Sequence, residues 1–212
     1  PVAPAPPSPG YTLSSSSVSV AENGGTGTYT VVLNTQPTDN VTFIITSDNT
    51  SQITVSPDNI TFGSGNYSTA QTITLTGVND DVDDDNVNVN ILNAISSTDT
   101  TYGALDNTTI TAVNVDDDTA GYTSTAPTDF YENGTTTAWT YRLNSKPTHN
   151  VTITMTSSDT GEVNPPSALT FTPSNWSSNQ SFTGVGVVDD EIDGSQFIIL
   201  TNAFTSTDSK YN

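Results

Sequence analysis

The chain contains two copies of one unit, and this internal repeat is the feature that most constrains its fold. Glu22-Asn23-Gly24 recurs as Glu132-Asn133-Gly134, a displacement of 110 residues (132 − 22). Further matches in the same register are Leu33-Asn34 with Leu143-Asn144, Pro37-Thr38 with Pro147-Thr148, and Asn40-Val41-Thr42 with Asn150-Val151-Thr152. After a one-residue slip follow Phe62 with Phe171, Asn66-Tyr67-Ser68 with Asn175-Trp176-Ser177, Asp80-Asp81 with Asp189-Asp190, Ser97-Thr98-Asp99 with Ser206-Thr207-Asp208, and Tyr102 with Tyr211. So many matches in register indicate a tandem repeat of one folding unit.

Within each copy the apolar residues alternate with polar ones, which is the period of half-buried strands. In Thr72-Ile73-Thr74-Leu75-Thr76 the alternation is unbroken, and Gly, Pro, Asn and Asp punctuate the gaps. The pattern predicts strands in the first copy near Ser17–Ala21, Thr28–Leu33, Val41–Ser47, Ile60–Phe62, Thr72–Val78, Val87–Leu92 and Thr109–Val115. Seven short strands in the first copy predict an all-β fold of two tandem immunoglobulin-like β-sandwiches.

The domain boundaries follow from the repeat. Residues 1–10 (PVAPAPPSPG) are proline-rich and predict an extended, semi-rigid leader. The first sandwich is expected over residues 11–118 and the second over 119–212. The second copy has no counterpart of Thr109–Val115, which is the last predicted strand of the first copy. Three explanations stay open: the sequence is a segment of a longer array, further residues follow, or a neighbouring subunit donates the strand and builds a head-to-tail filament.

The net charge of −20 restricts the partners of this chain. Almost every charged residue is negative, so nucleic acid and anionic lipid are not expected to bind. There are no cysteines, which excludes disulfides and thiolate metal sites, and no apolar stretch approaches the roughly 18 residues of a membrane span. The acidic, lysine-poor, Thr/Asn-rich composition is typical of secreted surface proteins, and we expect an extracellular or cell-surface location. The sequence has no initiating Met and no signal peptide, as in a mature product or an excised segment.

Two aspartate clusters lie in the first copy, and the first of them recurs at the equivalent point of the second copy. They are Asn79–Asp85 and Asp116–Asp118, and Asp189–Asp193 is a shorter echo of the first. Five carboxylates within six residues repel one another strongly, and the chain has only three lysines and arginines to offset them. Crowded carboxylate oxygens on loops suit Ca²⁺, which takes six to eight oxygen ligands. The alternative is a solvated acidic loop. An EF-hand does not fit, because Asn86 stands where its loop needs Gly and Leu92 where it needs Glu.

Four segments together resemble the Calx-β domain, the sandwich module of sodium–calcium exchangers and many bacterial surface proteins. They are Val20-Ala21-Glu22-Asn23-Gly24, Thr28–Leu33, Gly77-Val78-Asn79-Asp80-Asp81 and Val115-Asp116-Asp117-Asp118, and the resemblance extends over both copies from Tyr11 to Asn212. The resemblance implies Ca²⁺ bound by several loops at one end of the sandwich. Carried over by position, the implied ligands are Glu22, Asp48, Asp80, Asp81, Asp84, Asp116, Asp117 and Asp118 in the first copy, and Glu132, Asp159, Asp189, Asp190 and Asp193 in the second.

Nothing in the sequence has the pattern of a catalytic site. His149 is the only histidine, in a predicted turn, and no serine lies in a Gly-x-Ser-x-Gly motif. We therefore expect a protein that is not an enzyme. Trp139 aligns with Tyr29 on a predicted strand and is expected in the core. Trp176 aligns with Tyr67 in a loop, where packing is favoured over sugar stacking.

Nine Asn-x-Ser/Thr sequons would carry glycans if the source organism glycosylates asparagine. They are Asn40, Asn49, Asn59, Asn66, Asn107, Asn133, Asn150, Asn175 and Asn179. The favoured interpretation of the whole chain is a structural or adhesive surface protein, a Ca²⁺-rigidified repeat segment of a fibre or filament. Its partners would be further copies or further repeats. The alternatives are a binding module for a glycan or a protein, and a Ca²⁺-responsive regulatory module.

Overall fold

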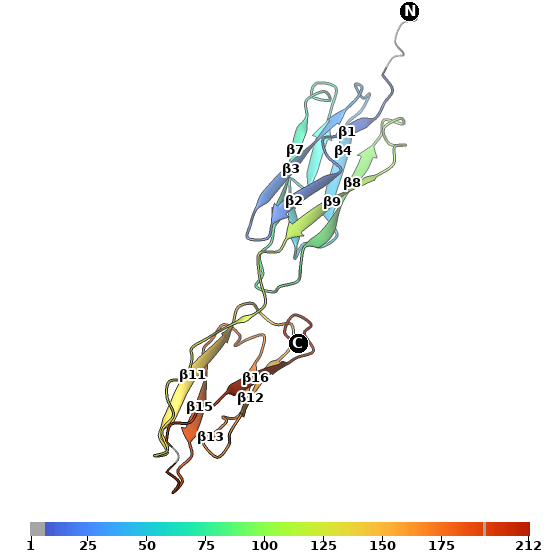
Figure 1. The fold of residues 1–212 in the computed structure, drawn as a ribbon. Helices are drawn as coiled ribbons and strands as arrows, with labels where there is room; N and C mark the ends of the chain where they lie inside the picture. The colour runs from blue at the N-terminus through green and yellow to red at the C-terminus, as the bar shows by residue number, and fades with distance from the viewer. Residues whose placement is uncertain (1–6, 193) are drawn as a thin grey trace, which may run out of the picture. The chain divides into compact units, whose positions relative to one another are not determined.

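The computed structural model describes residues 7–192 and 194–212, and in this part of the chain every regular element is a β-strand. Residues 1–6 of the predicted leader and Asp193 lie outside the described residues. The chain divides into two compact units (Figure 1). Unit 1 extends to Asp80 and continues from Asp84 to Asp117, and unit 2 contains Asp81–Asp83 and Asp118–Asn212. The predicted all-β class with immunoglobulin-like sandwiches is confirmed.

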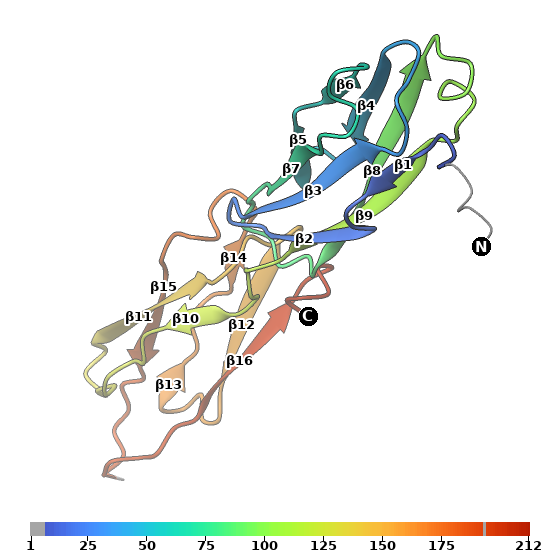
Figure 2. The ribbon, with the colours of Figure 1, turned by 90° about the horizontal axis from the view of Figure 1, so that it is seen from above.

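Unit 1 is a sandwich of two sheets, seen in Figure 2. The first sheet has the order β1-β3-β7-β5, with β1 (Tyr11–Leu13), β3 (Thr26–Leu33), β7 (Gln71–Gly77) and β5 (Ile53–Ser56). The second has the order β2-β9-β8-β4-β6, with β2 (Ser17–Ala21), β9 (Thr108–Val115), β8 (Val87–Ser97), β4 (Val41–Ser47) and β6 (Asn59–Phe62). All pairs are antiparallel except β2 with β9, which is parallel.

Unit 2 repeats this arrangement with two strands fewer. Its first sheet has the order β10-β11-β15-β13, with β10 (Tyr122–Ser124), β11 (Thr136–Leu143), β15 (Gln180–Gly186) and β13 (Val163–Asn164). Its second has the order β14-β12-β16, with β14 (Leu169–Phe171), β12 (Val151–Ser157) and β16 (Leu200–Thr205). Strand by strand this is the order of unit 1 without counterparts of β2 and β9 among the described residues.

The strand patterns explain the two cores, because alternate residues point inward. In unit 1 the core includes Phe43, Phe62 and Leu75, all without exposed surface. Unit 2 replaces Leu75 by Gly184, and a Cβ atom at Gly184 would lie 2.7 Å from Cε1 of Phe130. Phe130 itself replaces Val20. The larger ring therefore occupies the space that the glycine leaves, and the core volume is kept.

One tyrosine in each unit fixes the turn that follows β8 in unit 1 and β16 in unit 2. The Tyr102 hydroxyl donates to Thr35 O at 2.7 Å, and the Tyr211 hydroxyl donates to Ser145 O at the same distance. Both tyrosines are buried. Beside each tyrosine lies an aspartate, Asp99 or Asp208, that accepts the backbone N–H and the hydroxyl of the threonine that follows proline in the matched Pro-Thr pair. The matched Ser-Thr-Asp and Tyr residues of the repeat therefore build one corner twice.

Hydrogen bonds set the acidity of both corner aspartates. Bonds from the backbone and side chain of Thr38 lower the pKa of Asp99 to about 2. Burial on its own would raise the pKa of Asp208, but hydrogen bonds from Thr148 and the Lys210 backbone outweigh it and the pKa is lowered. Both carboxylates therefore favour folding when ionised, and their contribution is lost as the pH falls below the usual range of aspartate.

The structure adds two strands that the sequence pattern did not predict in the first copy, β1 and β5. Both are short strands at the edges of the first sheet, so they carry too few residues for an alternation to stand out. The seven predicted strands are all present. The β8 strand is longer than expected and ends at Ser97 instead of Leu92.

Candidate metal centre

Glu22 is a buried carboxylate at one end of unit 1. It follows directly after β2, and its backbone N–H donates to Val115 O at 2.9 Å, which extends the β2–β9 pairing by one residue. Its side chain turns inward, is 1 % exposed, and accepts the backbone N–H of Asp80 at 3.2 Å. A glutamate is rarely buried without a compensating group. This one therefore marks the end of the sandwich as a candidate functional site.

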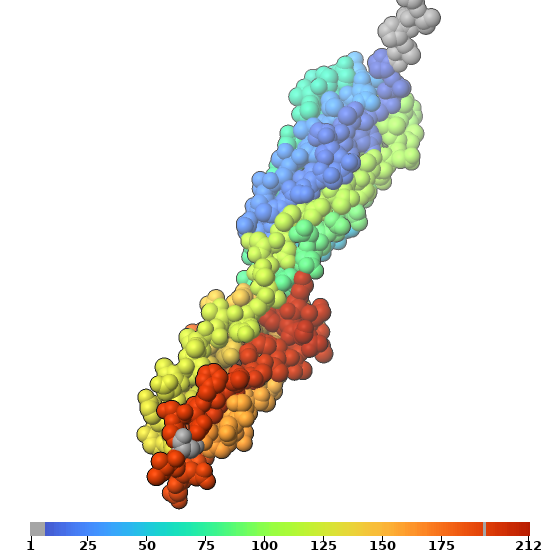
Figure 3. Space-filling model, viewed as in Figure 1, coloured from blue at the N-terminus to red at the C-terminus, as the bar shows by residue number. Residues whose placement is uncertain are grey.

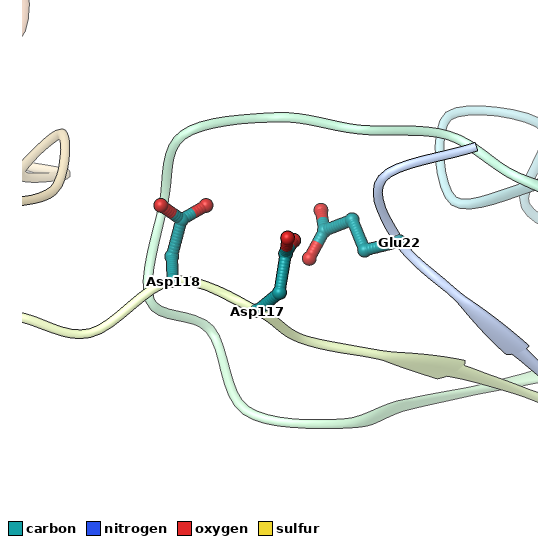
Figure 4. Close-up of side chains that lie close together, drawn as sticks. All are labelled: Glu22, Asp117 and Asp118. Carbon is teal, nitrogen blue, oxygen red and sulfur yellow. The ribbon is translucent and has the colours of Figure 1, made fainter. Parts of the chain in front are cut away.

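Carboxylates from two other segments converge on Glu22. Ligand oxygens of Glu22, Asp84 and Asp116 all lie within 4.8 Å of one another, and so do those of Glu22, Asp117 and Asp118. Figure 4 shows Glu22 reaching towards Asp117, with Asp118 beside it. Two oxygens bound to one Ca²⁺ at about 2.4 Å can be at most about 4.8 Å apart, so both groups satisfy this limit. The donors are all hard oxygens, which suits Ca²⁺.

The surroundings raise the pKa of Glu22 to about 7. Burial is the main cause, and the negative charges of Asp80, Asp84 and Asp116 add to it, while the hydrogen bond from the Asp80 backbone acts in the opposite direction. A bound divalent cation would reverse this balance, because it favours the ionised carboxylate. A cation at this site would therefore compete with a proton for the Glu22 carboxylate.

Backbone hydrogen bonds hold the acidic loop against the end of β9. The Asp85 N–H donates to Oδ2 of Asp116 at 2.8 Å, and the Asp116 N–H donates to Oδ1 of Asn86 at 3.1 Å. Asp85 has a φ of 63°, a left-handed conformation that Asp tolerates better than most residues. This turn brings Asp84 next to the residues that follow β9. The local sequence Asp84-Asp85-Asn86 is thus suited to this turn as well as to ligand binding.

Two buried amides support Asp84 from inside the sandwich. Gln52 donates from Nε2 to Oδ2 of Asp84 at 3.3 Å, and its Oε1 accepts Nδ2 of Asn114 at 2.8 Å. Among the described residues, Oδ1 of Asn114 is a buried side-chain atom without a hydrogen-bond partner. Neither residue was predicted from the sequence. Asn114 could have been noticed as the polar residue at an inward position of Thr109–Val115.

The other predicted ligands of the first copy lie outside the two groups of three. Asp48 binds Asn90, accepting its backbone N–H at 2.9 Å and its side-chain Nδ2 at 2.8 Å. Asp80 contributes its backbone N–H to Glu22. Asp81 belongs to unit 2, where its carbonyl accepts the Lys146 N–H at 2.6 Å.

Asp83, which the sequence analysis did not select, has a cation beside it. Its Oδ1 lies 2.6 Å from Nζ of Lys210, and its Oδ2 accepts the Ala120 N–H at 2.8 Å. The Lys210 side chain and the Ala120 N–H lower the pKa of Asp83. One member of the aspartate run is thus neutralised by a lysine 127 residues further along the chain (210 − 83).

In the second copy, no three of the described acidic residues converge as they do around Glu22. Glu132, Asp189 and Asp190 are exposed, and Asp193 lies outside the described residues. Asp159 accepts the Gly161 N–H at 2.8 Å, the same role that Asn49 has towards Ser51. The structural counterpart of Asp48 is Ser158, since the backbone of Ser158 bonds Ile199 as that of Asp48 bonds Asn90.

The remaining candidate residues have ordinary structural roles. Trp139 is buried as predicted, and Trp176 is half-buried against the same core, which agrees with packing. His149 is exposed. Two sequon asparagines cap their own turns: Asn66 accepts the Gly63 N–H, and Asn175 accepts the Thr172 N–H, each at 2.6 Å. Glycosylation stays a prediction. Among the described residues no helix is long and apolar enough to cross a membrane.

Comparison with known proteins gives distant structural likenesses. No family model matches the sequence, and no curated protein matches it. The calcium-binding domain CBD12 of CALX1.1 is 17 % identical, with a TM-score of 0.39 over 82 % of this chain and 74 % of that one. The periplasmic chaperone SfaE is 10 % identical, with a TM-score of 0.39 over 87 % and 88 %. SSP-19 of Caenorhabditis elegans, an MSP-domain protein, covers 49 % of this chain and 96 % of its own at a TM-score of 0.35 and 13 % identity. These likenesses concern the sandwich fold.

Proposed function

We propose that the protein is an extracellular structural or adhesive segment, in which Ca²⁺ rigidifies the end of the first sandwich. The observation that carries this proposal is the convergence of Glu22 with Asp84 and Asp116, and with Asp117 and Asp118, within the distances that one cation requires. A structural role fits the position of these residues, because they tie three separate segments at one end of unit 1. The resemblance to Calx-β domains in the sequence supports the choice of Ca²⁺.

Ca²⁺ would act at this site mainly by offsetting the repulsion between its carboxylates. Without a cation, the negative charges of Asp80, Asp84 and Asp116 disfavour ionisation of the buried Glu22. With Ca²⁺ bound, Glu22 ionises and the loop before β8 is held to the end of β9. A ligand that binds only the folded state at about 100 times its dissociation constant stabilises it by about 2.7 kcal/mol. Extracellular modules commonly use weak sites, since calcium is abundant outside cells.

The test is thermal unfolding with Ca²⁺ and with a chelator, followed by two probes. Both tryptophans lie in the second repeat, so their fluorescence reports unfolding there, whereas circular dichroism reports both repeats. We expect Ca²⁺ to raise the melting temperature of unit 1 by several degrees, since about 1 kcal/mol corresponds to 4–8 °C in a small domain. The fluorescence transition should move less.

Glu22→Gln and Glu132→Gln form a matched pair for this experiment. Glu22→Gln removes a buried carboxylate from both groups of three, and Glu132→Gln removes its exposed counterpart. The first variant should lose most of the Ca²⁺ response and the second should keep it. An unchanged melting temperature of the wild-type chain on adding Ca²⁺ would overturn the proposal.

A further inference from the structure

The free side of β16 differs from the matching strand of unit 1. In unit 1, β8 pairs with β4 on one side and with β9 on the other. In the described part of unit 2, β16 pairs with β12 alone. The registers agree: Thr42 is opposite Ser96, and Thr152 is opposite Thr205. β16 is therefore the counterpart of β8 with one neighbour fewer.

The missing neighbour leaves the inward side chains of β16, and of the residues just before it, partly exposed. Val89, Ile91 and Asn93 of β8 are 0 % exposed, and β9 pairs beside them in the same sheet. Their counterparts Ile198, Leu200 and Asn202 are only half-buried. These three positions keep side chains suited to a core, and yet they have solvent on one side.

A second segment of unit 2 lacks the neighbour that its counterpart has. In unit 1, β2 pairs with β9 in parallel and with no other strand. The matching residues 127–131 form no strand in unit 2, and Tyr131 is 59 % exposed. Figure 3 shows the surface of unit 2, where the yellow-green residues before β11 and the orange-red residues before β16 are both visible. One additional strand would give both segments a partner.

Tyr122 provides a third comparison. Its counterpart Tyr11 donates its hydroxyl to Asp106 O at 3.0 Å and contacts Thr108, so it binds the chain as it enters β9. Tyr122 has its ring on Phe204, with the ring centroids 4.8 Å apart, and is 44 % exposed. The residues that would meet an entering strand are present in unit 2, and they are more exposed than in unit 1.

The tyrosine corner decides from where such a strand would enter. In unit 1 the chain leaves the Tyr102 corner and begins β9 six residues later, at Thr108. In unit 2 the Tyr211 corner has the same hydrogen bond to the Ser145 carbonyl, so the chain leaves it from the same place in the sandwich. A strand attached to this corner needs only a short loop, whereas a strand from elsewhere must find the edge from solution.

We propose that the β16 edge of unit 2 is an acceptor for one further strand, joined in cis to the Tyr211 corner. It runs antiparallel to β16 and parallel to residues 127–131. Its inward face has the chemistry of β9, where Ile110, Ala112 and Asn114 alternate with outward residues. This inference goes beyond the proposed function and does not rest on Ca²⁺ binding.

The experiment extends the full chain with its own sequence. Asn212 occupies the position of Gly103, so residues 104–118 are appended directly after Asn212. A matched control carries Ile110→Asp and Ala112→Asp in the appended copy only, which places two charges on the inward face. Hydrogen exchange is measured with chelator present, so that a metal effect does not contribute. Residues 127–131 and β16 are the readout, and unit 1 is the internal reference.

The extended chain should show slower exchange in β16 and in residues 127–131. The tryptophan fluorescence of unit 2 should melt at least about 5 °C higher than in the original chain. The control should behave like the original chain. Equal exchange in all three proteins would overturn the proposal. Concentration-dependent protection of β16 in the original chain would identify a second copy as the occupant and overturn the donor in cis.

Discussion

The two repeats share a corner, a strand order and most of a core, and they differ in one element. β9 has three roles in unit 1: it flanks β8 in the sheet, it pairs with β2, and it leads into Asp116–Asp118. In unit 2 the described residues include no counterpart, and the three effects are missing together. In unit 2 the residues that match the inward positions of β8 are half-buried, and the segment that matches β2 is not a strand. No three described carboxylates of unit 2 converge. Core completion and the candidate metal centre thus depend on the same strand.

The largest expected effect is the loss of stability when inward side chains of β8 and β16 are truncated. Ile91→Ala removes a side chain with no exposed surface and should destabilise unit 1 by about 2–5 kcal/mol. Leu200→Ala removes its half-buried counterpart and should cost clearly less, because part of that surface already contacts water. Urea unfolding followed by circular dichroism for the first variant and by fluorescence for the second measures both. Equal costs would contradict the difference in burial between the two strands.

The pH dependence of unit 1 comes next in size. The pKa of Glu22 is raised from 4.5 to about 7, so the protonated form is favoured in the folded state. In chelator, the stability that this group contributes is full below pH 4.5 and is lost as the pH rises towards 7. The difference in pKa corresponds to about 3 kcal/mol as an order of magnitude.

Urea titrations at pH 4.5 and pH 7.5 in chelator measure this dependence. Glu22→Gln should remove it and Glu132→Gln should leave it, because Glu132 is exposed. The corner aspartates act in the opposite direction and at lower pH, since the pKa of Asp99 is lowered to about 2. A stability of unit 1 that rises between these two pH values would contradict the raised pKa of Glu22.

Much of the fold could be predicted from the sequence because alternation and internal repetition reinforce each other. The alternation of polar and apolar residues over Thr72–Thr76 matches the alternation of burial in β7, where Ile73 and Leu75 are buried. β1 and β5 were not predicted, because a short edge strand is defined by its pairing with a neighbouring strand. For Tyr11–Leu13 that neighbour is β3. The alternation of a single short segment contains no information about that neighbour.

The candidate site was less predictable than the fold. Glu22 and Asp84 could be selected as acidic residues that recur in the second copy, and Asp116 as a member of an acidic run. Which aspartates of the run turn towards Glu22 depends on the backbone of the loop, including the left-handed Asp85. The ion pair between Asp83 and Lys210 joins residues that are separated by more than half of the chain. Position along the sequence could indicate neither.

A smaller effect is expected for the amides behind the site. Gln52→Leu replaces the polar amide with an apolar side chain of similar size, and it leaves the buried Asn114 amide without its hydrogen bond to Gln52 Oε1. Loss of a hydrogen bond to a buried group costs about 1–3 kcal/mol. Because Gln52 also donates to Asp84, the variant should weaken Ca²⁺ binding as well as unit 1. Calorimetric titration with Ca²⁺ would measure the binding.

Asn114→Leu separates the two roles of that pair. It removes the buried atom that has no partner and leaves the Asp84 side of Gln52 in place. It should affect Ca²⁺ affinity less than Gln52→Leu does. Equal Ca²⁺ affinity in both variants and in the wild type would exclude a positioning role for Gln52 and leave only its packing.

The smallest expected effect concerns the corners, where the two repeats are most alike. Tyr102→Phe and Tyr211→Phe each remove a hydroxyl that donates to a backbone carbonyl at 2.7 Å and accepts a backbone N–H, at 3.2 Å in the first repeat and 3.1 Å in the second. Each variant should cost about 1–2 kcal/mol. The two costs should agree closely, because both hydroxyls have hydrogen-bond partners of the same kind and both tyrosines are buried. Circular dichroism for the first variant and fluorescence for the second provide the unfolding curves. A much smaller cost for Tyr211→Phe would mean that the second corner is not held as firmly as the first. It would then be a poor anchor for a further strand, and the two repeats would differ in more than β9.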